Sequence, residues 1–271
     1  MVVDFNPVFL ELGIIKLHWY GLMYIIGIGT AWLAGWWRIK WQPWRQWSPA
    51  HFSDLIFYCC LGVILGGRIG YLIFYGWSNI IEDPWFMIRV WQGGMSFHGG
   101  FLGVLVAVWL YGQSHRRSFI DIMDFVAPLA PLGLFFGRLG NFINGELWGK
   151  PTTVAWGMIF PSGGLIKRHP TQLYEMLLEG LAMFIILWLY SNRPRPRYAV
   201  SGLFLICYGA FRCFIELWRV PDEQIGYLVS NWLTMGQLLS LPMFVLGIAL
   251  MIEAYRRNYR VNAVLSQQGK R

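Results

Sequence analysis

Charged and polar side chains that could do chemistry lie inside the most hydrophobic parts of this 271-residue chain. The stretch GRLGNFINGE, residues 137–146, places Arg138 in an apolar segment and follows it with Asn141, Asn144 and Glu146. An arginine at the centre of a bilayer costs roughly 2.5–3.5 kcal/mol on insertion scales, and such residues usually have a function. We therefore expect Arg138 and its polar neighbours to form part of a site.

Two further arginines, Arg68 and Arg212, also lie within apolar stretches. A guanidinium group is planar and suits two-pronged binding of a phosphate, which in a membrane is a phospholipid headgroup. A long arginine near the end of a span can instead reach the headgroups without a specific role. That alternative is strongest for Arg68, because its surroundings, GGRIGY, offer no polar side chain besides Tyr71.

A histidine supplies the expected proton acceptor. His98 stands in SFHGGF, where Gly99 and Gly100 leave room beside the imidazole for something to approach. Imidazole titrates near neutral pH and is the commonest general base. His169, in RHPTQLYE, remains a competitor, and His18 fits an aromatic belt equally well.

The composition predicts an all-α, polytopic membrane protein. Hydrophobic residues make up 56% of the chain and charged residues 13%, and the mean hydropathy is +0.45. The apolar runs are long and continuous, as in membrane-spanning helices. We expect one transmembrane catalytic domain over residues 1–271, with a small extracytoplasmic cap at 144–172 and a basic cytoplasmic tail at 256–271. The seven predicted spans are 19–37, 52–76, 97–111, 120–143, 173–190, 199–217 and 233–255.

The distribution of lysine and arginine predicts the orientation. The loops after the first, third and fifth spans and the C-terminal tail hold thirteen of these residues, against six on the other side. Positive charge favours the cytoplasm, so the N-terminus is expected outside and the C-terminus inside. This places Arg68, Arg138, Arg212, Tyr20 and His98 toward the outer ends of their spans. The net charge of +8 is mostly this excess of basic residues on one side, and no nucleic-acid partner is needed to explain it.

The chain lacks the common cofactor and nucleophile motifs. There is no G-x-S-x-G, no nucleotide loop of the G-x-x-x-x-G-K-[ST] type and no aspartate-rich metal pattern. The four cysteines all fall in apolar spans, which argues against a disulfide framework or a zinc site. We therefore expect no metal and no cofactor.

Several motifs resemble the bacterial prolipoprotein diacylglyceryl transferases. The segment GRLGNFINGELWG, residues 137–149, meets each fixed position of that family's signature, G-R-x-G-N-F-x-N-x-E-x-x-G. The resemblance extends from the first span to the sixth. Its other parts are HWYGLMY at 18–24, SFHGGFLG at 96–103, HPTQLYE at 169–175 and SGLFLICYGAFRCFIELWR at 201–219.

The resemblance implies a reaction. An enzyme of this family would transfer the sn-1,2-diacylglyceryl group of phosphatidylglycerol to the lipobox cysteine of an exported prolipoprotein, releasing glycerol phosphate. This is the first step of bacterial lipoprotein maturation, at the outer face of the cytoplasmic membrane. The implied partners are phosphatidylglycerol, the prolipoprotein signal peptide with its lipobox, and membrane lipid.

The resemblance also implies roles for individual residues. Arg138 matches the signature arginine that contacts the phospholipid, Arg212 matches a second essential arginine, and His98 matches the candidate general base. Glu216 and Arg219 match further family positions of less defined role. Beside the two arginines, the substrate-binding set that the resemblance implies is Tyr20, Asn141, Asn144, Glu146, Gly149 and Tyr208. Arg68 joins the expected set only through its depth in the membrane, and its role is left open.

Two other functions fit the same residues. A lipid flippase or transporter with an arginine-lined cavity would place polar residues through the full depth of the membrane, whereas here they gather on one side. A phospholipid headgroup transferase acting on a sugar or alcohol is not excluded by composition.

Overall fold

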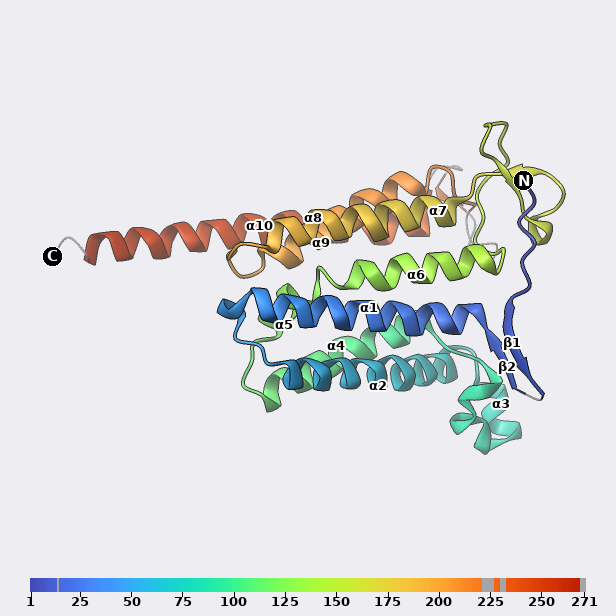
Figure 1. Ribbon diagram of the computed structural model, residues 1–271, viewed down its shortest axis with the longest axis horizontal. Coiled ribbons are helices and arrows are strands. Elements are labelled where there is room, and N and C mark those ends of the chain that lie inside the picture. Colours follow the sequence, from blue (N-terminus) through green and yellow to red (C-terminus); the bar gives the residue numbers. More distant parts are fainter. Residues whose placement is uncertain (14, 221–226, 230–232, 269–271) are drawn as a thin grey trace. The chain divides into compact units, whose positions relative to one another are not determined.

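The computed structural model describes residues 1–13, 15–220, 227–229 and 233–268, and most of them are helical (Figure 1). The α-helices are α1 (Trp19–Trp41), α2 (Pro49–Phe74), α3 (Trp77–Glu82), α4 (Phe97–Ser114), α5 (Phe119–Val126), α6 (Ala130–Ile143), α7 (Thr171–Glu175), α8 (Met183–Ser191), α9 (Ala199–Ile215) and α10 (Met235–Gln268). A π-helix, η5 (Met176–Ala182), joins α7 to α8. Short 3₁₀ helices lie at Pro43–Arg45, Pro84–Ile88, Val90–Gln92 and Pro161–Gly163.

Each of the seven predicted spans is helical over most of its length. The fourth span is broken, because α5 ends at Val126 and α6 begins at Ala130, with Pro128 between them. Proline has no backbone N–H and interrupts the helical hydrogen bonds at this point. The fifth span is one helical stretch, Thr171–Ser191, with the π-helix in its middle.

The helices have the length and composition of a membrane protein. By these measures the stretches Pro49–Phe74, Thr171–Ser191 and Met235–Arg257 can each cross a bilayer, and the broken pair α5–α6 can form a fourth span. Large apolar side chains such as Ile25, Leu65 and Leu246 are exposed along the helices. Exposed apolar side chains along helices of this length fit contact with lipid. That all seven segments cross the membrane stays a prediction.

The all-α prediction is incomplete, because three two-stranded antiparallel hairpins occur among the described residues. Most of their residues lie outside the predicted spans, but β6 takes the place of helix at the start of the predicted span 233–255. The hairpins pair β1 (Val8–Leu12) with β2 (Ile15–His18), β3 (Met158–Ile159) with β4 (Lys167–Arg168), and β5 (Tyr227–Val229) with β6 (Leu233–Thr234). The second hairpin lies in the predicted 144–172 cap, which an isolated bridge between Val2 and Ile159 connects to the N-terminus.

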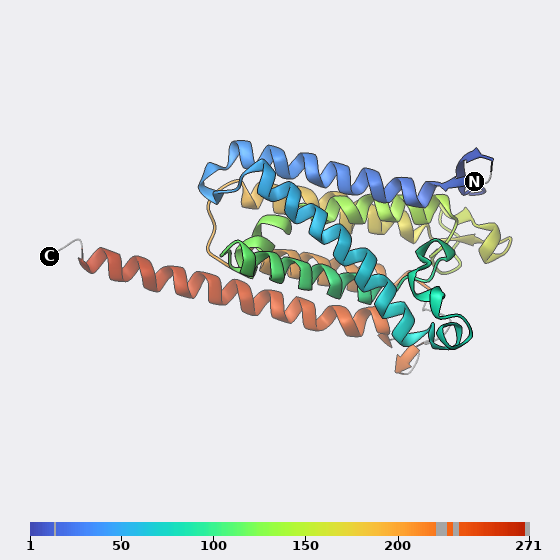
Figure 2. The same ribbon diagram turned by 90° about the horizontal axis from the view of Figure 1, so that it is seen from below.

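The chain divides into two compact units. The first comprises Met1–Gly35 and Asp124–Arg271 and is built around α6, the α7–η5–α8 stretch, α9 and α10. Its buried apolar cluster comprises Ala127, Met183, Leu187, Val200 and Cys207. In two perpendicular views α9 runs along the first part of α10 (Figures 1 and 2).

The second unit, Trp36–Met123, is built on the packing of α2 against α4. Ser96 caps α4 by accepting a hydrogen bond from the backbone N–H of Gly99. Gly99 lies against α2, and a Cβ atom added there would come 3.0 Å from the Cα of Gly70. The room predicted beside His98 is therefore taken at Gly99 by the backbone of α2.

Candidate functional site

Arg138 of α6 and Arg212 of α9 meet at one carboxylate, Glu175, at the end of α7. The Nε atom of Arg138 lies 3.0 Å from Oε2 of Glu175, and Nη1 of Arg212 donates a hydrogen bond to Oε1. The Glu175 side chain is completely buried, whereas those of Arg138 and Arg212 are 18% and 13% exposed. A buried charge is tolerated when it is paired and hydrogen-bonded, so Glu175 is what keeps these arginines in the apolar bundle.

A second carboxylate extends this contact toward α10. Glu216 Oε1 lies 2.7 Å from Nη2 of Arg212, and its Oε2 accepts a hydrogen bond from the Thr234 hydroxyl at 2.9 Å. Arg219 donates to Glu175 at 3.0 Å. The ion pairs therefore join α6, α7 and α9. The hydrogen bond from Thr234 connects them to the residue that precedes α10.

Glu179 completes the cluster from one turn further along the fifth span. Its buried carboxylate lies 3.7 Å from Nη2 of Arg138 and 3.8 Å from Nη1 of Arg212. It sits in the π-helix η5, and π-turns inside α-helices often mark functional sites. We call the six residues the charge network. Their formal charges balance, and they are Arg138, Glu175, Glu179, Arg212, Glu216 and Arg219.

The polar residues that follow Arg138 in the sequence form a connected group. Asn141 donates to Glu146 Oε1 at 2.8 Å, and Asn144 donates to the same oxygen at 3.4 Å. Arg138 Nη1 donates to Oδ1 of Asn141 at 3.4 Å. The Tyr20 hydroxyl lies beside Asn141 and Glu146. The structure thus brings Tyr20, Asn141, Asn144 and Glu146 together and connects them to the charge network.

Gly149 lies where three stretches of backbone converge. Its N–H donates to the His169 carbonyl at 2.8 Å, and it pairs with Arg219 in an antiparallel bridge. A Cβ atom at this position would come 2.6 Å from the Trp218 carbonyl and 2.8 Å from the His169 carbonyl. The family-matched glycine is therefore required by close packing between the cap and the ends of α7 and α9.

We expect Gly149→Ala to lower the activity of this site by about tenfold or more, because small displacements of positioned groups cost much of the rate. The added methyl group must push the cap strand away from the Trp218 and His169 carbonyls, and this moves the segment that carries Glu146. Gly164→Ala is the matched control, because a Cβ atom there meets nothing within 4 Å although its φ of +91° adds some strain. Initial rates in membranes at equal protein content test this. Gly149→Ala activity equal to that of Gly164→Ala would contradict it.

Three other residues of the predicted site, Tyr208, Arg68 and His98, differ in where they lie. Tyr208 of α9 is in electrostatic contact with Glu179 and Arg212 and stacks on Phe204. Arg68 and His98 belong to the second unit. The His98 side chain is exposed in the first turn of α4.

Arg68 is committed to backbone carbonyls within its own unit. Its side chain is 4% exposed, and it donates to the carbonyl groups of Phe86, Met87, Gly93 and Gly94. These contacts hold the loop between α3 and α4. They give Arg68 a structural role that its sequence surroundings did not indicate, and its substrate-binding role stays a prediction.

Comparison with known proteins identifies the family. The model of the family "Prolipoprotein diacylglyceryl transferase" matches residues 7–253. A phosphatidylglycerol–prolipoprotein diacylglyceryl transferase from Pseudomonas paraeruginosa is 56% identical over 254 residues, which cover 93% of this chain and 95% of that protein. The chain belongs to the prolipoprotein diacylglyceryl transferase family. The protein of the same name from Coxiella burnetii is 52% identical over 255 residues, 94% of this chain and 97% of that protein.

Two carboxylates of the charge network, Glu175 and Glu179, were not predicted from the sequence. The available signal was charge within a predicted span, since both lie in the otherwise apolar segment 173–190. A four-residue separation places them on one face of a helix. Counting acidic as well as basic residues inside spans would have found the pair.

His169 lies in the same unit as the charge network of this family member. Its Nδ1 atom is 3.1 Å from the Tyr174 hydroxyl, and its backbone N–H donates to the Lys150 carbonyl. Burial lowers the pKa of His169, so its imidazole is neutral at pH 7 and can accept a proton. It therefore remains the competitor to His98 that the sequence indicated.

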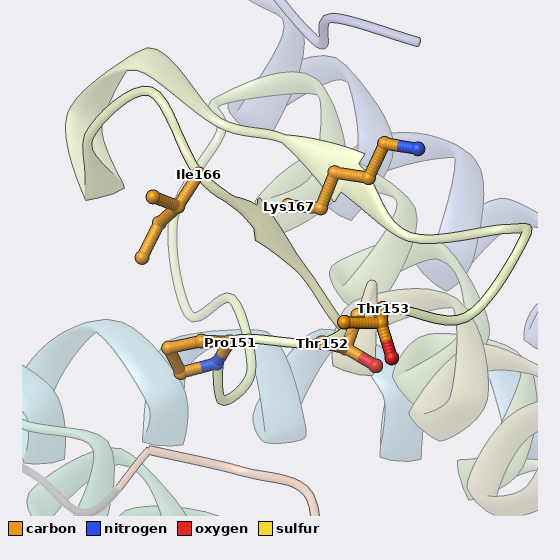
Figure 3. A pocket seen from close by; sticks show the side chains of 5 residues that line it. All are labelled: Pro151, Thr152, Thr153, Ile166 and Lys167. Carbon is orange, nitrogen blue, oxygen red and sulfur yellow. The ribbon is translucent and has the colours of Figure 1, made fainter.

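The cap contains an open cavity of about 720 Å³ (Figure 3). Pro151, Thr152 and Thr153 line one part of it, and Ile166 and Lys167 line the other. None of these residues belongs to the charge network. Among the described residues, no group of three or more His, Cys, Asp or Glu side chains is arranged to hold a metal ion.

Proposed function

We propose that this chain transfers the diacylglyceryl group of phosphatidylglycerol to the lipobox cysteine of a prolipoprotein, and that Arg138 and Arg212 bind the lipid phosphate. Family membership supports the reaction. The observation that carries the site assignment is the meeting of these two arginines, from α6 and α9, at Glu175 beside the Asn141–Glu146 group. Side chains of opposite charge hold the guanidinium groups in place before any lipid binds.

The arginines retain hydrogen-bonding capacity for a phosphate. A guanidinium has five N–H donors, and within the described residues Arg138 Nε has an ion pair to Glu175 but no aligned hydrogen bond. Its Nη1 atom makes a hydrogen bond of 3.4 Å to Asn141, which is long for a strong contact. A phosphate oxygen placed near these atoms would gain short, charge-assisted hydrogen bonds.

The reaction exchanges one carbon–oxygen bond for one carbon–sulfur bond. The lipobox thiol, with an ordinary pKa of roughly 8.5, loses its proton to a base. The thiolate attacks the glyceryl carbon that carries the phosphate ester, and the electron pair of the broken bond leaves with glycerol phosphate. The products are a diacylglyceryl thioether and glycerol phosphate, whose added negative charge the arginines stabilise.

The remaining residues would position the reacting groups. Asn141, Asn144 and Glu146 orient Arg138, and Tyr20 borders the same group. Gly149 fixes the cap segment against the residues that precede α7 and follow α9. His98 is assigned as the base, and the substrate-binding role of Tyr208 rests on its contact with the network.

The site would face the outside of the bacterial cytoplasmic membrane. Thirteen lysines and arginines on one set of loops against six on the other support an external N-terminus and a cytoplasmic C-terminus. With seven crossings, the cap and the outer ends of α6 and α9 then lie on the external side. Exported prolipoproteins and outer-leaflet phosphatidylglycerol meet on that side.

Mass spectrometry of a lipobox peptide tests this function. Purified protein is incubated with phosphatidylglycerol and the peptide, and the peptide is then weighed. We expect a mass gain of one diacylglyceryl group that disappears when the peptide cysteine is replaced by serine. No gain in the peptide, combined with lipid movement across a proteoliposome bilayer, would favour the flippase. Modification of an added sugar or alcohol, with none of the peptide, would favour a headgroup transferase.

Replacing His98 tests the identity of the base. We expect His98→Gln to lower the transfer rate by about 10²–10⁴-fold, the usual contribution of a general base. His169→Gln is the matched comparison and should keep most of the activity. Rates are measured in membranes with folded protein quantified separately. Near-normal turnover of His98→Gln would reject the assignment, and selective loss in His169→Gln would transfer the role to His169.

A further inference from the structure

Glu179 differs from the other carboxylates of the charge network in how it is held. Its side chain is completely buried, and neither carboxylate oxygen has a hydrogen-bond partner among the described residues. Its ion-pair distances to Arg138 and Arg212 are 3.7 and 3.8 Å. These contacts are too long to be hydrogen bonds, so Glu179 interacts with both guanidinium groups through charge alone.

The other two carboxylates are fixed by hydrogen bonds. Glu175 Oε1 accepts from both Arg212 and Arg219, the latter at 3.0 Å. Glu216 accepts from Thr234 at 2.9 Å and pairs with Arg212 at 2.7 Å. Displacing either of them would break a short contact to a fixed donor. Displacing the charge of Glu179 breaks no hydrogen bond.

We propose that Glu179 is a positioning residue whose carboxylate neutralises Arg138 and Arg212 between turnovers. When the lipid binds, its phosphate replaces this carboxylate as the partner of the two arginines. The inference rests on the proposed phosphate-binding role of these two arginines. Glu179 approaches both guanidinium groups, as a phosphate bridging them would. It thereby pairs the two positive charges in an apolar bundle, where unpaired charges are costly.

The formal charges of the network determine how Glu179 affects the binding of substrate and product. Three arginines and three glutamates leave the network formally neutral, so a phosphodiester adds one uncompensated negative charge. The leaving glycerol phosphate is a monoester of charge −1.5 to −2 at neutral pH, so the excess grows as the reaction proceeds. Glu179 therefore weakens the binding of both substrate and product, and it weakens product binding more.

The test compares Glu179→Gln with the unchanged protein. The amide has the size of the carboxylate but no charge. We expect the inhibition constant of glycerol phosphate to fall about tenfold, equivalent to about 1.4 kcal/mol. The KM for phosphatidylglycerol should fall, and kcat should fall because product leaves slowly. Glu253→Gln, which removes a carboxylate from the exposed pair with Arg257, should change none of these values.

A purely structural role for Glu179 predicts the opposite. Loosened arginines would raise the inhibition constant and KM, or lower the folded fraction without changing either, and each of these results would overturn the proposal. Protection of the protein from thermal unfolding by glycerol phosphate gives the same comparison without turnover. Absence of peptide modification by the unchanged protein would reject the proposed function, whereas the protection experiment would still decide the role of Glu179.

Glu179→Asp covers the case in which the glutamine variant does not fold. It retains the charge but moves the carboxylate away from both guanidinium groups by about one carbon–carbon bond. We expect an inhibition constant between those of the unchanged protein and the neutral variant, about threefold below the former. An unchanged or raised inhibition constant in Glu179→Asp would overturn the proposal.

Discussion

Arg138→Gln is expected to lower the rate of diacylglyceryl transfer by about 10²–10³-fold, the loss typical of removing one donor that stabilises developing charge. The variant loses the cation facing Glu175 and Glu179 and the donor to Asn141. Arg138→Lys should recover little of the rate, because a single ammonium cannot reproduce the planar fork. Initial rates with a lipobox peptide, at equal amounts of folded protein, give the comparison.

Arg257→Gln is the control for this prediction. Arg257 pairs with Glu253 at 2.5 Å on the exposed surface of α10, and exposed ion pairs contribute little to stability. Its activity should match that of the unchanged protein. An Arg138→Gln variant that retains more than a third of normal activity would contradict a phosphate-binding role for Arg138.

Glu175→Gln is expected to destabilise the first unit by about 3–5 kcal/mol, the range for removing one partner of a buried ion pair. The carboxylate contacts Arg138, Arg212 and Arg219. Without it, only Glu179 and Glu216 remain to balance the three positive charges. Thermal unfolding of the purified protein in detergent measures the effect. Activity should fall as well, since the guanidinium groups would no longer be fixed.

A double-mutant cycle separates this ion pairing from general damage. Arg219→Met removes one of the cations that Glu175 holds, so the double variant should lose clearly less stability than the sum of the two single variants. Glu253→Gln should leave the unfolding temperature nearly unchanged. Strict additivity of Glu175→Gln and Arg219→Met would mean that the 3.0 Å contact between them contributes nothing.

The sequence predicted the helices well because their signal is local. Long apolar runs specify helices in a membrane whatever surrounds them, and all seven predicted spans are mostly helical. The group from Arg138 to Glu146 was also predictable, since these residues lie within one helix end and its following turn. The hairpins were missed because segments of two to five residues carry too little periodicity to be recognised.

The partners of distant residues could not be predicted in the same way. The contact between Arg212 and Glu175 joins positions 37 residues apart and depends on how α7 packs against α9. Gly99 was interpreted as room for a ligand, but its position against α2 is set by the partner helix. The carbonyl partners of Arg68 likewise lie 18 to 26 residues away along the chain.

The central claim is that Arg138 and Arg212 bind the phosphate of phosphatidylglycerol, and native mass spectrometry tests it most directly. Protein released from detergent with limiting phosphatidylglycerol should retain one lipid molecule. Retention should fall at least tenfold in both Arg138→Gln and Arg212→Gln and stay normal in Arg257→Gln. Zwitterionic phosphatidylcholine should be retained poorly by all four proteins. Equal retention of phosphatidylglycerol by the unchanged protein and both network variants would contradict the account.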